Sequence, residues 1–122
     1  MGHVYVVATF YNAVDYIQYL KGKCKLEDVR RVDAEALVDT GATFPALPED
    51  KVEELGLPLI GEQPAETAEG AKSVKLAAQL IIKIEDRSSE TYAIVRPKDT
   101  TPLIGVVALE QMGYRVNSAT GS

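Results

Sequence analysis

The tripeptide Asp39-Thr40-Gly41 is the first candidate for chemistry, because it places a carboxylate directly after the apolar residues Leu37 and Val38. A positioned carboxylate can act as a general acid or a general base. The alternatives are few, since His3 is the only histidine and Cys24 the only cysteine. A histidine-based triad and a Cys/His zinc cluster are therefore not expected. We expect no metal and no cofactor.

Three interpretations of the tripeptide compete. Asp and Gly are favoured in turns, so the segment could be an ordinary turn. A phosphate loop of the sugar-kinase type also uses Asp-x-Gly, but such folds need a second phosphate loop and a chain much longer than 122 residues. The third interpretation is the active site of an aspartic protease, in which two carboxylates work as a pair. The surrounding elements must discriminate among them.

The first half of the chain predicts strands around the tripeptide and a helix after it. Val4 to Phe10 and Arg31 to Val38 have the β-branched and alternating patterns of strands. Pro48 to Gly56 predicts a helix with proline in its first turn and glycine as its C-cap. Tyr11 to Arg30 stays open. The spacing of Val14, Ile17 and Leu20 fits a short amphipathic helix, whereas Tyr16, Tyr19 and Gly22 allow a strand and a turn.

The second half predicts a projecting hairpin and then a short strand-helix unit. Gly61 to Lys72 is polar with a turn signal at Glu69-Gly70, and extended segments flank it, the stronger being Ser73 to Glu85. The remaining expected elements are a strand at Glu90–Arg96, an apolar run at Leu103–Gly105, a helix at Val107–Met112, a last strand at Tyr114–Val116 and a frayed tail from Asn117. An apolar strand, a tight turn and a short helix thus occur twice, which suggests two related halves.

The sequence resembles the retropepsin (retroviral-type) aspartic protease family in its small single-domain bacterial and archaeal form. The resemblance covers Ala36 to Val116 and rests on the segments Ala36–Thr43, Leu47-Pro48, Leu55-Gly56-Leu57 and Leu103-Ile104-Gly105. It implies a mainly β fold, a small closed β-barrel-like acid protease half with one or two short helices and a flap hairpin. Residues 1–122 would be one domain, with an N-terminal strand and insertion at 1–35, the core at 36–116 and a tail at 117–122.

The resemblance also implies roles for individual residues. Asp39 would be catalytic, and Thr40 would join the two active-site loops across a dimer axis. Gly41 gives the turn its freedom, and Ala42 completes the loop. The flap would carry Ala68, Glu69 and Gly70, while Leu103, Ile104 and Gly105 would support the catalytic loop. Substrate pockets would come from the flap, the Leu47 region and Ile104.

The expected function is an aspartic endopeptidase that hydrolyses peptide bonds in peptide or protein substrates. Only one Asp-Thr-Gly is present, so the second carboxylate must come from a second copy in a C2 homodimer. Ala42 lacks the hydroxyl that would favour the ionised pair, and we therefore expect activity nearer neutral pH than in digestive acid proteases. The alternatives are an inactive or weakly active dimer that serves as a binding or adaptor module, and a protease active only in a larger assembly or on itself.

Two features depart from the family pattern. Val106-Val107 stand where the family usually places a charged or polar pair, and about twenty residues, Tyr11 to Arg30, precede the catalytic strand. The retroviral members dimerise through N- and C-terminal strands, for which Val4–Ala8 and Tyr114–Val116 are the candidates.

Composition and charge limit the classes of partner that we expect for this protein. With 13 Lys and Arg against 18 Asp and Glu, the net charge of −5 disfavours nucleic acid. No apolar stretch is long enough for a membrane span, and the N-terminus does not have the pattern of a signal peptide. We expect a cytoplasmic protein.

Overall fold

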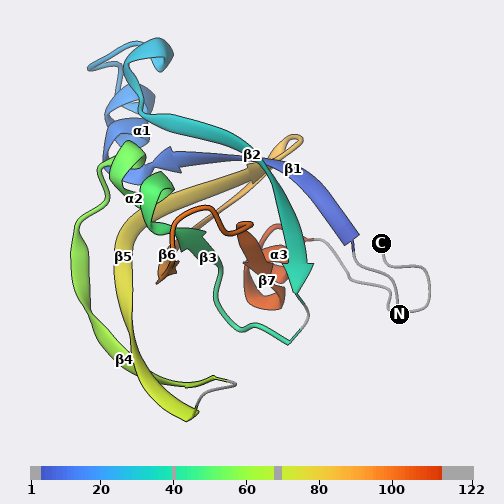
Figure 1. Cartoon of the computed structure of the whole chain (residues 1–122). Coiled ribbons are helices and arrows are strands. Elements are labelled where there is room, and N and C mark those ends of the chain that lie inside the picture. Colours follow the sequence, from blue (N-terminus) through green and yellow to red (C-terminus); the bar gives the residue numbers. More distant parts are fainter. Residues whose placement is uncertain (1–3, 40, 68–69, 114–122) are drawn as a thin grey trace.

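The structure is a computed structural model that describes residues 4–39, 41–67 and 70–113. These residues form seven strands, three α-helices and one short 3-10 helix, in agreement with the mainly β expectation (Figure 1). The strands are β1 (Val4–Asn12), β2 (Arg31–Asp39), β3 (Ala46–Pro48), β4 (Leu59–Thr67), β5 (Gly70–Ile84), β6 (Arg87–Arg96) and β7 (Leu103–Gly105). The helices are α1 (Ala13–Leu20), α2 (Glu49–Leu55) and α3 (Val106–Gln111), with the 3-10 helix η1 at Leu26–Asp28.

Six of the strands close into a barrel. Their order is β1-β2-β7-β3-β6-β5, and β5 pairs again with β1 through Thr9–Asn12 and Leu80–Lys83. The β2–β7 and β3–β6 pairs are parallel, and the other pairs are antiparallel. The remaining strand, β4, pairs with β5 outside the ring. The predicted closed barrel is confirmed.

The barrel encloses the main core. Alternation along β1 and β2 turns Phe10 and Ala36 inward, where both are fully buried. Leu47, Leu80 and Ile104 join them without exposed surface. Burying each large side chain contributes about 1.5–3 kcal/mol. The core therefore holds β2 and β7 together directly behind the Asp39 segment.

The open segment Tyr11–Arg30 contains a helix. β1 continues to Asn12, whose side chain caps α1 by accepting a hydrogen bond from the backbone N–H of Asp15 at 3.0 Å. The residues that α1 packs inward differ from those its apolar spacing suggests. Ala13 is buried, whereas Val14 and Leu20 are 53% and 65% exposed. A second apolar cluster, formed by Tyr11, Ala13, Val29 and Ile81 with Tyr16, Tyr19 and Cys24 packed against it, fixes the helix instead.

Polar contacts tie this inserted segment to α2 and hold its beginning and end together. Buried Asn12 donates from its side-chain amide to the carbonyl of Leu55 at 2.9 Å. Arg30 donates to both carboxylate oxygens of Asp15, from Nε at 2.8 Å and from Nη2 at 3.1 Å. The hydrogen bonds from Arg30 lower the pKa of Asp15, and those to Asp15 raise the pKa of Arg30. The helix is thus anchored at its first turn.

Helix α2 forms where the sequence predicts it, with one correction at its start. Pro48 is the last residue of β3 and the N-cap, with an extended backbone (φ −64°, ψ 149°), and so it does not lie in the first helical turn. Glu49 begins the helix. Gly56 ends it at φ 67°, a left-handed conformation that glycine adopts without strain.

The hairpin of β4 and β5 projects from the barrel as predicted. Its pairs run from Leu59↔Ala77 to Thr67↔Gly70, with an irregularity between Leu59 and Gly61. Gly70 to Lys75 pair only with β4, whereas the later part of β5 pairs with β6 and β1. Figure 1 shows this half extending away from the body of the molecule. Ala68 and Glu69, at the predicted tip, lie outside the described residues.

The C-terminal elements agree with the expected strand and helix. β6 begins earlier than predicted, at Arg87, and α3 follows β7 without a loop. The predicted strand Tyr114–Val116 and the tail lie outside the described residues. Among the helices that the structure describes, none is long and apolar enough to cross a bilayer.

Candidate active site

Asp39 is the last residue of β2, and strands on both sides hold it. β1 pairs with β2 through Val4↔Val38, and β7 pairs with it through Asp39↔Gly105. The Asp39 side chain is half-buried, while Val38 packs against the main core. A carboxylate at the open end of a strand that is paired on both edges is rigidly placed and still reachable by solvent.

The turn after Asp39 fixes the orientation of its carboxylate. The backbone N–H of Gly41 donates to Asp39 Oδ1 at 2.9 Å, and the N–H of Ala42 donates to the Asp39 carbonyl at 3.1 Å. Asp and Gly form this kind of local turn readily. The carboxylate is therefore held by its own loop. Thr40, the middle residue of the predicted motif, lies outside the described residues.

β7 passes directly beneath the loop because Gly105 has no side chain. A Cβ placed on Gly105 would lie 2.7 Å from the carbonyl oxygen of Thr43 and 2.9 Å from that of Ala42. Both atoms belong to the backbone and cannot move aside cheaply. Leu37 donates its N–H to the carbonyl of Pro102 at 2.9 Å, which joins the two strands before the turn. The supporting role that the resemblance implies for this strand stays a prediction, and the close packing is the geometry that such a role requires.

The structure brings most of the described site residues together. The parallel pairing of β2 with β7 aligns Leu37 with Leu103 and Val38 with Ile104, so the two segments that suggested related halves lie side by side. Gly70 begins β5 in the projecting hairpin with φ 108°. One expectation is wrong in the described chain: Leu47 and Ile104 are fully buried in the core. They have no exposed surface with which to line a substrate pocket.

Two aromatic residues near the loop were not predicted. Phe44 lies five residues after Asp39, and its ring centroid is 4.7 Å from that of Tyr92 on β6. In the sequence both look like ordinary strand residues. Only the parallel pairing of β3 with β6, which aligns Ala46 with Ile94, brings them together.

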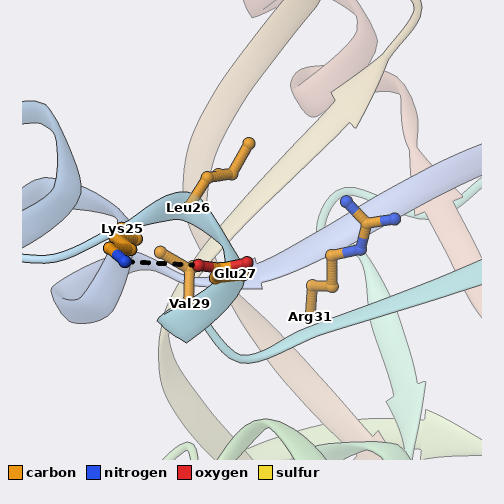
Figure 2. A pocket seen from close by; sticks show the side chains of 5 residues that line it. All are labelled: Lys25, Leu26, Glu27, Val29 and Arg31. Atoms are coloured by element: carbon orange, nitrogen blue, oxygen red, sulfur yellow. Dashed lines mark ion pairs between the residues drawn. The ribbon is translucent and has the colours of Figure 1, made fainter.

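A hollow of about 590 Å³ lies elsewhere, on the inserted segment (Figure 2). Its walls are the side chains of Lys25, Leu26, Glu27, Val29 and Arg31. Lys25 is paired with Glu27 at 3.9 Å and Arg31 with Asp33 at 3.2 Å, so both cations already have a carboxylate partner. This hollow does not include any residue of the Asp39 loop. Among the described residues, no three His, Cys, Asp or Glu side chains gather in a way that could hold a metal ion.

Comparison with known proteins gives the family. The sequence profile of the gag-polyprotein putative aspartyl protease family matches residues 27–111, well over half of the chain. The chain belongs to this family. The matched part of this retropepsin-like protein runs from η1 to the end of α3, and α1 precedes it.

Comparison with solved structures also supports the retropepsin-like fold of this chain. A structure described as EIAV protease complexed with the inhibitor HBY-793 is similar to this chain with a TM-score of 0.63 and 13% sequence identity. The similarity covers 95% of this chain and 93% of the other. At that identity the likeness establishes the fold. No curated protein matches the sequence.

Proposed function

We propose that this retropepsin-like protein is an aspartic endopeptidase that acts as a C2 homodimer, with one Asp39 contributed by each chain. The observation that carries the proposal is the placement of Asp39: a half-buried carboxylate at the end of β2, held by the Gly41 N–H at 2.9 Å above Gly105. One chain supplies a single such carboxylate. The family to which the chain belongs supports proteolysis in general.

In the proposed reaction the two Asp39 carboxyl groups share one proton, because two like charges so close together do not both ionise. The ionised carboxylate takes a proton from a bound water, and the oxygen of that water attacks the carbonyl carbon of the peptide bond. The protonated carboxyl donates its proton to the carbonyl oxygen, which gives a tetrahedral gem-diol. The carboxyl that took the proton from water then donates it to the amide nitrogen, the other carboxylate takes a proton from one hydroxyl of the gem-diol, and the C–N bond breaks to release the amine and the new carboxylic acid. Gly70 and its neighbours in the hairpin would close over the substrate.

The first test replaces Asp39→Asn, which keeps the shape of the side chain and removes the ionisable group. Cleavage of a peptide library, followed by mass spectrometry, is expected to fall by about a thousandfold or more. The matched control is Asp33→Asn, the same change on the exposed part of the same strand, which should leave cleavage within about twofold of the wild type.

Binding of a statine-type peptide to the wild type would support the transition state that the mechanism requires. Sedimentation should show a dimer for both the wild type and Asp39→Asn. Retained cleavage by Asp39→Asn, or a strictly monomeric protein at high concentration, would overturn the proposal. A dimer that binds peptides without cutting them would favour the binding or adaptor module. A pH–rate optimum below about 3 would contradict the expectation based on Ala42.

A further inference from the structure

A second cavity lies beside the active-site loop and is separate from the hollow on the inserted segment. Its volume is about 430 Å³, which is enough for one large side chain or a small ligand. Four parts of the chain line it: the loop after Asp39, β5, β6 and α3. The lining residues are Phe44, Ala78, Gln79, Glu90, Thr91, Tyr92 and Gln111.

An irregularity in strand pairing makes room for this cavity. β5 and β6 pair at Ala77↔Ala93 and again at Leu80↔Thr91. Between these pairs β5 has two residues, Ala78 and Gln79, opposite Tyr92 alone. Such a bulge bends the strand and redirects side chains, and bulges are common next to functional sites. The bulge, the ring of Tyr92 and the cavity thus occupy the same place.

The aromatic wall connects the cavity to the catalytic loop. The rings of Phe44 and Tyr92 are inclined at 35° with their centroids 4.7 Å apart. Both side chains are half-buried, so part of their surface remains available to a ligand. A ligand that contacts this pair therefore contacts the loop that begins at Asp39.

The polar wall carries one negative charge. Glu90 is exposed and forms no ion pair within the described part of the chain. It precedes Tyr92 by two residues in β6, so the two side chains leave the strand on the same side. Gln111 adds an amide whose Oε1 accepts the hydroxyl of buried Ser89. An aromatic ring face beside a carboxylate attracts a cation. The planar guanidinium group can stack on the ring and donate paired hydrogen bonds to the carboxylate at the same time.

We propose that the cavity lined by Phe44, Tyr92 and Glu90 is a subsite for an arginine side chain of the substrate, next to the catalytic loop. An anionic ligand would meet the Glu90 carboxylate, and an apolar ligand would leave the polar wall without partners. The net charge of −5 also favours the approach of a cationic peptide. That the bound arginine belongs to a substrate rests on the proposed protease function. The binding of an arginine side chain in this cavity does not depend on that function.

The binding test uses the full-length Asp39→Asn protein and two probes, acetyl-arginine methylamide and acetyl-citrulline methylamide. Citrulline has nearly the shape of arginine without its charge. In NMR titrations the amide signals of Phe44, Tyr92 and Gln111 should shift with the arginine probe, with an affinity about tenfold higher than for the citrulline probe. Glu90→Gln should bring the two probes to equal affinity. The control Glu35→Gln, an exposed carboxylate on β2 outside this cavity, should leave the tenfold difference intact.

The cleavage test forms a double-mutant cycle on peptides that the active protein cuts. Exchanging one arginine for citrulline should lower kcat/KM about tenfold for the wild type and by less than twofold for Glu90→Gln. Equal binding of the two probes, or shifts confined to residues outside the cavity, would overturn the subsite. So would an equal loss on both peptides for Glu90→Gln. Arginine binding together with a wild-type protein that cuts no peptide would reject the protease function and keep the cavity as a guanidinium site.

Discussion

At the scale of single residues, the site depends on the backbone at two glycines, Gly41 and Gly105. Asp39 is oriented by the N–H of Gly41, and the loop that follows rests on Gly105, where any side chain would collide with the carbonyls of Thr43 and Ala42. Both glycines therefore help to position the Asp39 carboxylate, Gly41 through its N–H and Gly105 by allowing β7 to pack closely against the loop. The position of the loop is set by how closely β7 can approach it.

Gly105→Ala should destabilise the protein and displace the loop. Its Cβ would lie 2.7 Å from the carbonyl oxygen of Thr43, closer than side-chain carbon atoms approach backbone. Overpacking of this kind costs about 1–3 kcal/mol. Thermal unfolding should show a Tm lower by roughly 5–15 °C.

The matched control for this change is Gly61→Ala. A Cβ at Gly61 meets no atom within 4 Å, so its Tm should stay within about 2 °C of the wild type. Equal Tm values for Gly105→Ala and the wild type would show that the loop can shift to accept the added Cβ without loss of stability. The supporting role of β7 would then be rejected.

At the scale of elements, the sequence predicted the helices and strands near the motif better than the inserted segment. The alternation in Arg31–Val38 and the capping residues around α2 act locally, so they can be read without tertiary information. In α1 the decisive contacts are tertiary. Tyr16 and Tyr19 pack against a second cluster that includes Ile81, a residue far along the chain. The apolar spacing thus indicated a helix correctly but not the residues that it buries.

Asp15→Asn should remove a pH-dependent part of the stability. Arg30 holds the pKa of Asp15 below its ordinary value of 3.8, so the folded chain binds this proton less readily than the unfolded chain. The contribution is complete above that value and is lost as the pH falls through the lower folded pKa. At pH 6 urea unfolding should show a loss of at most about 1 kcal/mol, since Arg30 is half exposed, and the loss should shrink below pH 4.

Glu27→Gln provides the control on the same inserted segment. Its carboxylate is 3.9 Å from Lys25 and both side chains are at least three-quarters exposed, so no measurable change is expected at either pH. If Asp15→Asn lost the same free energy at pH 6 and pH 3, the Asp15–Arg30 pair would not be the source of the pH dependence.

At the scale of the whole molecule, the proposed dimer must bring together two chains of net charge −5. Salt screens repulsion between like-charged proteins over about 10 Å at 0.1 M and about 3 Å at 1 M. The dissociation constant of the dimer should therefore fall by a few-fold between about 0.02 and 0.5 M NaCl. Sedimentation equilibrium measures it directly.

The double variant Glu27→Gln and Glu54→Gln tests whether repulsion between the net charges causes this salt dependence. It changes the net charge from −5 to −3, and both positions are exposed. Its dimer should be tighter at low salt and respond less to added salt. A dimer that weakens as salt is added would show that attractive charge pairs, and not net repulsion, govern the assembly.

The sequence predicted those parts of the candidate site whose residues are adjacent in the chain, and it did not predict the parts whose residues are far apart. Asp39 and Gly41 belong to one tripeptide, and Leu103-Ile104-Gly105 forms an apolar run that is visible by itself. The cavity beside the loop combines Phe44, Tyr92 and Gln111, which are far apart in the chain. It also depends on a bulge at Ala78 and Gln79 for which no glycine or proline gives a signal. Long-range pairing must be known before such a place can be recognised.

One strand, β5, belongs both to the projecting hairpin and to the barrel wall. Its fifteen residues run without a break from Gly70 to Ile84. Gly70 to Lys75 pair only with β4, and pairing with β6 begins at Leu76, so the bulge at Ala78 and Gln79 lies inside the part of β5 that the barrel already holds. A side chain seated in the cavity would therefore contact the anchored part of the same strand from which the hairpin projects.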